Sequence, residues 1–232
     1  MELYSPMFET IKKVNLKSLI NLYLSDLPGP VDCLNMIQLK DESMYKIYGA
    51  TLSPLLLLGG SKILWLATMK DNIYNEGSFN KSLIVRYSSH RRFLQMILNP
   101  YYWFTNLFRE AGTAELELSF TQANIMQFNQ EKNEFLLIRF DDSTTDIKRL
   151  AIDLHMKVNY HSKRLADIHI YDGDIPDNAT NPIRFSNTMI LDSYNTSSIN
   201  QFEEKLKNEG IEFALSTWVK ESLPEPINSL IG

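Results

Sequence analysis

Cysteine is nearly absent from this sequence, and that scarcity removes several classes of protein at once. Cys33 is the only cysteine among the 232 residues. It has no partner for an intrachain disulfide, and a cysteine-based zinc site would lack its other ligands. Since Cys33 sits in an apolar segment, we expect a buried, unreactive thiol, and the chain fits a reducing environment.

An excess of positive charge is also missing. The chain carries 23 Lys and Arg against 28 Asp and Glu, a formal net charge of −5. That balance gives no electrostatic footprint for nucleic acid or for an anionic membrane. The segments 81–87 and 185–194, expected as third strands, also lack the aromatic platform of an RNA-recognition module. We therefore expect neither a nucleic-acid partner nor a membrane partner.

Long uninterrupted apolar runs are lacking. The most apolar window, 47–69, is broken by Pro54, Gly59-Gly60 and Lys62, whereas a membrane-spanning helix needs about 20 apolar residues. The opening residues Met-Glu-Leu-Tyr-Ser-Pro show no basic start followed by an apolar core, which predicts no signal peptide. A helix, a turn and a strand explain the window 47–69 better than a membrane-spanning helix does. We therefore expect a cytoplasmic protein.

Recognisable catalytic and metal-binding motifs are missing too. No Gly-rich phosphate loop, nucleophile elbow or Cys-His pairing occurs. His155 and His161 are six residues apart, which misses the spacing of a helical metal pair, and the acidic segment 172–178 lacks the glutamate that ends a calcium loop. We predict no cofactor. Haem stays open as an alternative, because His90, His155 or His169 can act as a ligand of its iron.

Internal repetition is what the sequence does contain. Residues 34–43 and 134–143 both read as an apolar run, then two acids, then a serine. Repetition of this kind indicates one small structural unit used twice in the chain.

Each half also shows the same order of predicted elements: strand, helix, strand, strand, helix, strand. The first set spans 31–39, 44–58, 61–69, 81–87, 90–98 and 113–120, and the second spans 133–140, 143–160, 164–171, 184–194, 197–210 and 213–219. Pro54 is expected to kink or split its helix. We assign residues 1–28 to an N-terminal helical extension with a helix at 8–24, residues 29–121 to the first repeat and residues 132–222 to the second.

A βαββαβ unit folds as a four-stranded antiparallel sheet with two helices on one face, the ferredoxin-like arrangement. The expected strands are apolar at consecutive positions, which indicates that both faces of each sheet are covered. The bare faces of the two sheets can cover each other. The sequence therefore predicts an α+β fold of two tandem ferredoxin-like (βαββαβ) repeats, paired through their sheets as a barrel with the helices outside.

Several short segments of the first half resemble one bacterial family. They are Gly29-Pro30 with the strand that runs to Lys40, Tyr48 and Pro54 with Gly59-Gly60, Leu64-Trp65, the strand end Arg86-Tyr87, Asn99-Pro100-Tyr101 and Arg109-Glu110-Ala111-Gly112. In this order they are similar to the domain of unknown function 1330 family over residues 28–120. The second half keeps only the order of the elements.

The resemblance implies a dimeric α+β barrel, formed here within one chain. That superfamily includes small monooxygenases, haem-degrading enzymes and ligand binders, while the family itself has no settled activity. The resemblance therefore supports the fold more than any function.

Five residues are candidates for ligand binding: Asn35, Tyr48, Arg86, Tyr87 and Arg109. Asn35 is a polar residue in a buried strand, where it either satisfies neighbouring polar groups or faces a ligand. Arg86 and Arg109 either form ion pairs at a sheet edge or bind a carboxylate or phosphate. Tyr48 and Tyr87 belong to the segments that carry the family resemblance.

Two functions of different class follow. The first is a small-molecule-binding or structural barrel without catalytic machinery, holding an apolar or carboxylated molecule between sheet and helices. The alternative is a cofactor-free monooxygenase-like or isomerase-like enzyme for a small carboxylated or aromatic metabolite, with Asn35, Arg86 and Arg109 orienting the anion. Because no acid–base pair stands out, we favour binding. The fused repeat predicts a monomer, or a homodimer if the aromatic segment 101–104 is exposed.

Overall fold

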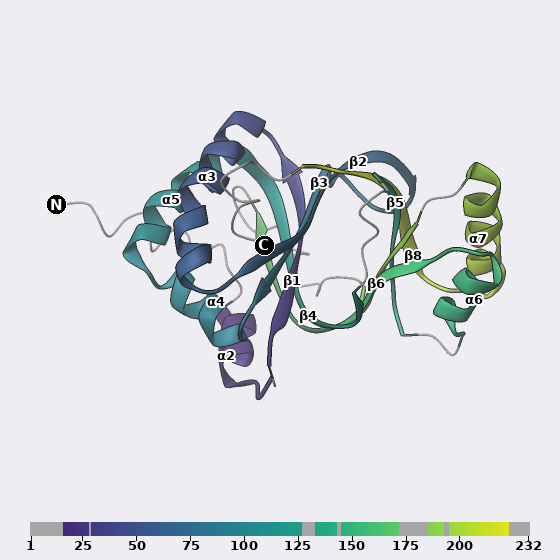
Figure 1. Cartoon of the computed structure of the whole chain (residues 1–232), viewed down its shortest axis with the longest axis horizontal. Coiled ribbons are helices and arrows are strands. Elements are labelled where there is room, and N and C mark those ends of the chain that lie inside the picture. Colours follow the sequence, from purple (N-terminus) through teal and green to yellow (C-terminus); the bar gives the residue numbers. More distant parts are fainter. Residues whose placement is uncertain are drawn as a thin grey trace.

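The computed structural model of the chain describes residues 16–27, 29–126, 133–142, 145–171, 185–192 and 195–222. Within these ranges, eight antiparallel strands close a barrel in the order β1-β3-β2-β8-β5-β7-β6-β4. Helices cover the barrel on two opposite sides, with α2 to α5 on one side and α6 and α7 on the other (Figure 1).

The elements fall into two sets of the same order. The first set is β1 Val31–Leu39, α3 Glu42–Leu58, β2 Lys62–Tyr74, β3 Lys81–Tyr87, α4 His90–Ile97, α5 Pro100–Gly112 and β4 Thr113–Met126, preceded by α2 Leu16–Leu24. The second set is β5 Glu134–Phe140, α6 Ile147–Asp153, β6 Val158–Tyr171, β7 Asn187–Asp192, α7 Thr196–Asn208 and β8 Phe213–Lys220. The predicted fold class of two tandem ferredoxin-like repeats is confirmed.

Two seams join the halves into one barrel. In each half, the last strand pairs with the first, the first with the third, and the third with the second. The seams form where β2 pairs with β8 and where β4 pairs with β6. The sheet faces that the sequence left bare therefore cover each other, as predicted.

Side chains alternate between the barrel interior and the layer beneath the helices. The interior is filled by large apolar side chains from both halves: Leu34, Met36, Trp65, Ala67, Ile84, Phe135, Leu137, Ile190 and Trp218. Two further apolar clusters lie outside the barrel wall, one under each group of helices. An eight-stranded barrel is just wide enough to be filled by its own side chains, and this one is.

The two halves align one residue away from the match seen in the sequence. Lys40 N–H donates to Gly112 O (2.9 Å), and Asp141 N–H donates to Glu212 O (3.4 Å), at the same place in each half. Lys40 thus corresponds to Asp141, an offset of 141 − 40 = 101 residues, where the sequence match uses 100. A slip of one residue moves every side chain to the other face of a strand, so this correction matters.

Helix α3 runs through Pro54 without a break, contrary to the prediction of a kink or split. Leu52 and Leu56, on either side of the proline, are both buried against the sheet. In this helix, tertiary packing of the apolar face outweighs the intrinsic cost of proline.

The segment after Asn99-Pro100 forms a further helix, α5, which the sequence pattern did not predict. Pro100 occupies the first helical position, where its missing N–H costs nothing. The Asn99 side chain caps the helix by accepting from Tyr101 N–H (2.9 Å). The proline therefore starts this helix as well as ending the previous one.

The helix expected at 143–160 is wrong in its second half. Helix α6 ends at Asp153, and β6 begins at Val158. His155 takes a left-handed backbone with φ of 59°, and Met156 N–H donates back to Ala151 O (2.9 Å). This is the usual geometry of a helix end, but here it lacks the glycine that would have signalled it.

Strands β2 and β4 are longer than predicted. They extend to Tyr74 and Met126, whereas the sequence predicted that these strands end at residues 69 and 120. The additional residues pair across the seams with β8 and β6. The N-terminal helix is described only from Leu16, and residues 8–15 and 172–178 lie outside the described part of the chain. None of the described helices is long and apolar enough to cross a membrane.

Replacing Gly112 by alanine should destabilise the fold. A Cβ at this position would lie 2.7 Å from Tyr45 N and 3.0 Å from Asp41 O, both backbone atoms of the start of α3. We expect Gly112→Ala to cost about 1–3 kcal/mol of unfolding free energy, measured by denaturant titration, because the backbone must move apart.

Gly49→Ala is the matched control, because a Cβ on Gly49, within α3, meets nothing within 4 Å. This variant should gain about 0.5–1 kcal/mol from helix propensity. Equal effects of the two substitutions would contradict the close approach of α5 to α3.

Candidate functional site

Helix α5 has its polar side turned inward. The side chains it buries are Thr105, Asn106 and Arg109, together with the backbone at Gly112. Its outward side carries Tyr101, Phe104 and Leu107, which are 43%, 54% and 45% exposed. A surface helix normally buries its apolar stripe, so this inversion marks the layer beneath α5 as unusual.

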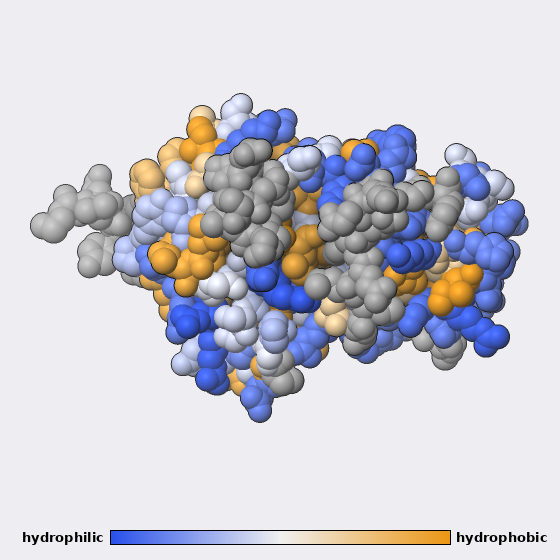
Figure 2. All heavy atoms as spheres, in the orientation of Figure 1, coloured by the Kyte–Doolittle hydropathy of each residue, from blue (hydrophilic) through white to orange (hydrophobic). Residues whose placement is uncertain are grey.

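The apolar residues exposed on α5 lie at the α3–α5 end of the molecule, where hydrophobic atoms reach the surface (Figure 2). Leu57 and Leu58 of α3 and Leu98, just before α5, add to the exposed apolar residues. The aromatic segment 101–104 is thus partly exposed, with Tyr102 and Trp103 turned further inward.

Helix α3 faces the polar side of α5 with tyrosines. Tyr45, Tyr48, Leu52 and Leu56 share one stripe by their spacing of three and four residues. The two leucines pack onto the apolar cluster of the barrel wall, and the two tyrosines pack beside them. The chain places α5 against the start of α3 at Gly112, whose carbonyl accepts from Lys40 and Asp41 N–H (2.9 and 3.2 Å).

Five polar side chains meet in this layer: Tyr45, Tyr48, Tyr87, Tyr102 and Arg109. We call them the tyrosine–arginine cluster. Tyr87 comes from the end of β3, the other tyrosines come from α3 and α5, and all four belong to or pack against the apolar cluster of the first repeat. Three of the sequence-predicted ligand residues, Tyr48, Tyr87 and Arg109, are therefore brought together.

Burial raises the pKa of the Tyr45, Tyr48 and Tyr87 phenols above their ordinary value of 10.0. The charge of Arg109 acts in the opposite direction on the pKa of Tyr45 and Tyr48, which places the guanidinium close to both. At neutral pH these phenols are protonated, so they offer O–H donors and not a base. Within the described part of the chain, none of the three hydroxyl groups forms a hydrogen bond.

Arg109 is 3% exposed, yet only part of its guanidinium is satisfied. Its Nε donates to Asn106 Oδ1 (2.6 Å), and Asn106 Nδ2 in turn donates to Glu110 Oε1 (2.9 Å). The nearest ion-pair contact, from Arg109 Nη2 to Glu110 Oε1, is long at 3.8 Å. The buried Nη2 has no hydrogen-bond partner among the described residues. An unsatisfied buried charge-bearing group is costly and calls for a partner.

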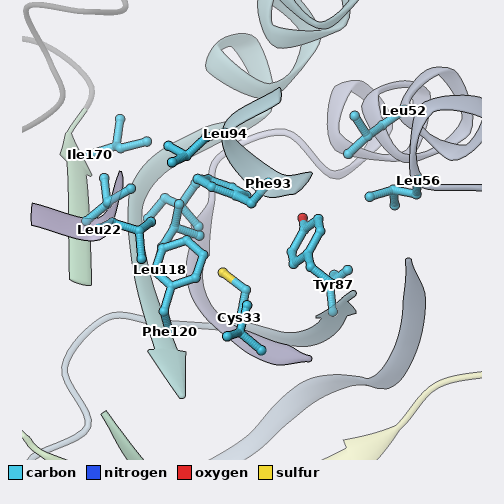
Figure 3. Packing of buried hydrophobic residues seen from close by; sticks show 14 of the residues in the cluster. Leu22, Cys33, Leu52, Leu56, Tyr87, Phe93, Leu94, Leu118, Phe120 and Ile170 are labelled. Carbon is cyan, nitrogen blue, oxygen red and sulfur yellow. The ribbon is translucent and has the colours of Figure 1, made fainter. Parts of the chain in front are cut away.

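The surroundings of these polar groups are apolar. Figure 3 shows the Tyr87 hydroxyl pointing between Phe93 and Leu52 of α3, with Leu56 to one side of the ring and Cys33 to the other. Burial raises the pKa of the Cys33 thiol well above its ordinary value, in line with the predicted inert cysteine. The layer thus combines apolar walls with a few polar groups, the composition typical of a small-molecule site.

The other two sequence-predicted residues lie elsewhere. Asn35 shares its strand face with Cys33 and Ile37, and its side-chain amide donates to Cys33 O and Leu83 O (2.9 and 3.1 Å). It satisfies backbone groups, which is the structural role considered for it.

Arg86 lies at the end of the barrel where β1 starts, away from the helical layer. Its Nε and Nη2 donate to Asp32 Oδ1 and Oδ2 (2.7 and 2.9 Å), a bidentate ion pair. Tyr160 OH contacts Asp32 Oδ2 (3.5 Å) and Thr121 Oγ1 (2.9 Å), so β6 of the second half joins this group. Arg86 therefore forms an ion pair at one end of the barrel, which is the structural role considered for it.

The described histidines do not converge on one point. His90 is buried at the start of α4, near Asp26, and His155 is exposed at the end of α6. The side chain of His169 and the acidic segment 172–178 lie outside the described residues. Among the described side chains, no group of three or more His, Cys, Asp or Glu is arranged to hold a metal ion.

The second repeat offers a direct contrast. Its equivalent layer under α6 and α7 is built from apolar side chains such as Leu136, Met156, Met189, Phe202 and Leu215. The tyrosine–arginine cluster is thus a property of one half only. Tyr102 was noted from the sequence only as part of the aromatic segment 101–104. Tyr45 was missed, although its spacing from Tyr48, Leu52 and Leu56 would have placed it on the same face.

No protein-family model matches the chain and no curated protein matches it, so the resemblance to the domain of unknown function 1330 family stays a prediction. Solved structures do match. One is a protein of unknown function from Rhodopseudomonas palustris, 21% identical, with a TM-score of 0.43 over 45% of this chain and 89% of that chain.

Two further matches cover more of the chain. An anthrone oxidase-like protein is 7% identical, with a TM-score of 0.48 over 85% of this chain and 93% of that chain. A chlorite dismutase variant from Candidatus Nitrospira defluvii is 9% identical, with a TM-score of 0.46 over 92% of this chain and 99% of that chain. At these identities and TM-scores, no residue role passes from either protein to this chain.

Removing a hydroxyl from the cluster should not destabilise the fold. We expect Tyr87→Phe to change the unfolding free energy by less than about 0.5 kcal/mol, because no hydrogen bond to a described residue is lost. Tyr160→Phe, which breaks the contacts with Thr121 and Asp32, should cost about 1–3 kcal/mol by the same denaturant titration. A larger loss for Tyr87→Phe than for Tyr160→Phe would mean that Tyr87 is structural.

Proposed function

We propose that the chain binds a small molecule carrying a carboxylate and a flat apolar group, in the layer between α3, α5 and the barrel wall. The observation that carries this proposal is the inverted helix α5, which buries Arg109 and leaves its Nη2 without a hydrogen-bond partner among the described residues. A folded protein tolerates such a group when a ligand completes it.

A carboxylate is the partner that suits the guanidinium best. It accepts two parallel N–H donors from an arginine and compensates the buried charge at the same time. The phenol hydroxyl groups of Tyr45, Tyr48 and Tyr87 supply further donors to the anion or to a second polar group of the ligand. The leucines of α3 and Phe93 offer apolar contact to the rest of the molecule.

The enzyme alternative receives less support from these residues. Removal of a proton from a substrate requires a base whose pKa lies near the working pH, whereas burial keeps the three phenols protonated. Glu110 is tied to Asn106 and Arg109 through its carboxylate. A binding role therefore fits the cluster better than a cofactor-free oxygenase or isomerase role. Closure of the barrel within one chain favours a monomer, whereas the exposure of Tyr101 and Phe104 meets the condition set from the sequence for a homodimer.

Benzoate is a suitable probe of the site. It should raise the thermal unfolding midpoint of the wild-type protein, because a ligand at 100 times its Kd stabilises the folded state by about 2.7 kcal/mol. Arg109→Gln should abolish the shift, and the neutral analogue benzyl alcohol should give little or none with either protein.

Arg91→Gln is the matched control, since Arg91 is an exposed arginine of the neighbouring helix α4. It should respond to benzoate as the wild type does. A shift of equal size in Arg109→Gln, or no shift with any aromatic carboxylate tested, would contradict the proposal. Native mass spectrometry of freshly purified protein would then show whether another class of molecule is retained.

A further inference from the structure

The connection between β2 and β3 folds back into one end of the barrel. Gly77 takes a left-handed backbone with φ of 79°, which reverses the chain. The Asn72 side chain holds the turn by accepting from Glu76 N–H (3.3 Å) and donating to Gly77 O (3.0 Å). Glu76 and Phe79 are buried as a result, at 1% and 6% exposure. We call residues 75–80 the β2–β3 plug.

Inside the barrel, Glu76 meets one cation and a second carboxylate. Arg139 Nη2 lies 2.5 Å from Glu76 Oε1, and Arg139 Nη1 donates to Glu117 Oε2 (2.5 Å). Ser216 Oγ donates to Glu76 Oε2 (3.2 Å). The guanidinium also lies 5.4 Å from the ring centroid of Phe79. Glu76 and Glu117 come from the first half, whereas Arg139 and Ser216 come from the second.

The charges in this group do not balance. Among the described side chains, two carboxylates face one guanidinium, and the side chains of Glu76, Arg139 and Glu117 are 0%, 6% and 12% exposed. Asp71 of β2 does not add to the imbalance, because its side chain is exposed to solvent, where Thr217 Oγ1 donates to its carboxylate (3.3 Å). One uncompensated negative charge in the barrel interior is costly, and one bound proton removes it.

We propose that the β2–β3 plug is locked into the barrel by one proton on Glu76, so that the plug is released as the pH rises. Glu76 is the more buried of the two carboxylates. In support, burial raises the pKa of Glu76, against the opposing effects of Arg139 and Ser216, and Glu117 raises it further. The proton thereby couples the two halves of the chain.

The direction of the pH dependence follows from proton linkage. A carboxyl group whose pKa in the folded state lies above its ordinary value of 4.5 binds more protons folded than unfolded. Stability is therefore fully present below about pH 4.5, falls as the pH rises through the folded-state pKa, and then levels off. This is the reverse of the usual behaviour of a salt-bridged carboxylate, which loses stability in acid.

The first test compares unfolding at a series of pH values for the wild type and Glu76→Gln. The ratio of their unfolding equilibrium constants should change by about tenfold per pH unit within this window, the slope of one proton. Glu134→Gln removes an exposed carboxylate of β5, paired with Lys70, and should follow the wild type. Glu117→Gln should also flatten the dependence, since Glu76 can then ionise beside Arg139.

The second test follows the plug itself. Trp65 and Trp218 lie in the barrel interior, and Trp103→Phe removes the remaining tryptophan. In this background, quenching by acrylamide should increase as the pH rises through the window, and Glu76→Gln should abolish the increase. Infrared difference spectra of the wild type should show a protonated carboxyl C=O band that disappears over the same pH range.

Parallel stability profiles for the wild type and Glu76→Gln, or pH-independent quenching, would overturn the proposal. If Glu76→Gln does not fold, the infrared measurement on the wild type decides. A protonated carboxyl band that titrates within the window supports the proton on Glu76, and its absence shows that Glu76 is ionised and that the plug has no proton lock.

Discussion

Closure of the barrel at its two seams is the constraint on which the other features depend. Each four-stranded sheet carries an apolar face that no helix covers, with Leu34, Met36 and Trp65 on one sheet and Phe135 and Trp218 on the other. Pairing of β2 with β8 and of β4 with β6 buries both faces and leaves no open sheet edge. The hydrophobic gain and the backbone hydrogen bonds of the seams therefore arise together.

Polar side chains at the two ends of the barrel reinforce this closure. Each group spans the halves: Tyr160 of β6 reaches the Asp32–Arg86 ion pair, and Arg139 of β5 reaches Glu76 and Glu117. Buried ion pairs contribute less to stability than apolar contacts of the same size, but they tolerate few alternative partners. We interpret them as fixing which strands meet, while the apolar interior supplies most of the free energy.

Because apolar side chains fill the middle of the barrel, the candidate ligand site lies in a layer outside the barrel wall. The two layers differ. The second is closed by apolar contacts among residues such as Leu136 and Phe202, whereas the first buries Arg109 among phenols. The differences between the halves follow from the fusion: in a symmetric homodimer, any residue placed in one layer appears in the other as well.

Much of this architecture could be predicted from the sequence. Apolar strand segments, the helix stop at Gly59-Gly60 and the repeated order of elements were sufficient for the fold class. The limits of β2 and β4 were not, because their last residues are strands only through pairing across the seams. Helix α5 was missed because its buried face is polar, which is the opposite of the pattern that reveals a surface helix.

Only part of the candidate site could be predicted from the sequence. Tyr48, Tyr87 and Arg109 come from distant segments, and only the crossing of α5 over α3 at Gly112 brings them together. The sequence could not show which face of β1 and β3 points into the barrel. Asn35 lies on the strand face outside the barrel wall, where its side chain donates to backbone carbonyl groups. Arg86 lies on the opposite face and pairs with Asp32.

Because both seams lie within one chain, closure of the barrel is a unimolecular step. In a barrel made from two identical chains, the sheets meet in a bimolecular step, so dilution separates them and stability depends on protein concentration. Here both sheets belong to one polypeptide, and the second sheet is always present at a high effective concentration. Barrel closure is thus a first-order process, and the assembled state persists however few copies of the protein are present.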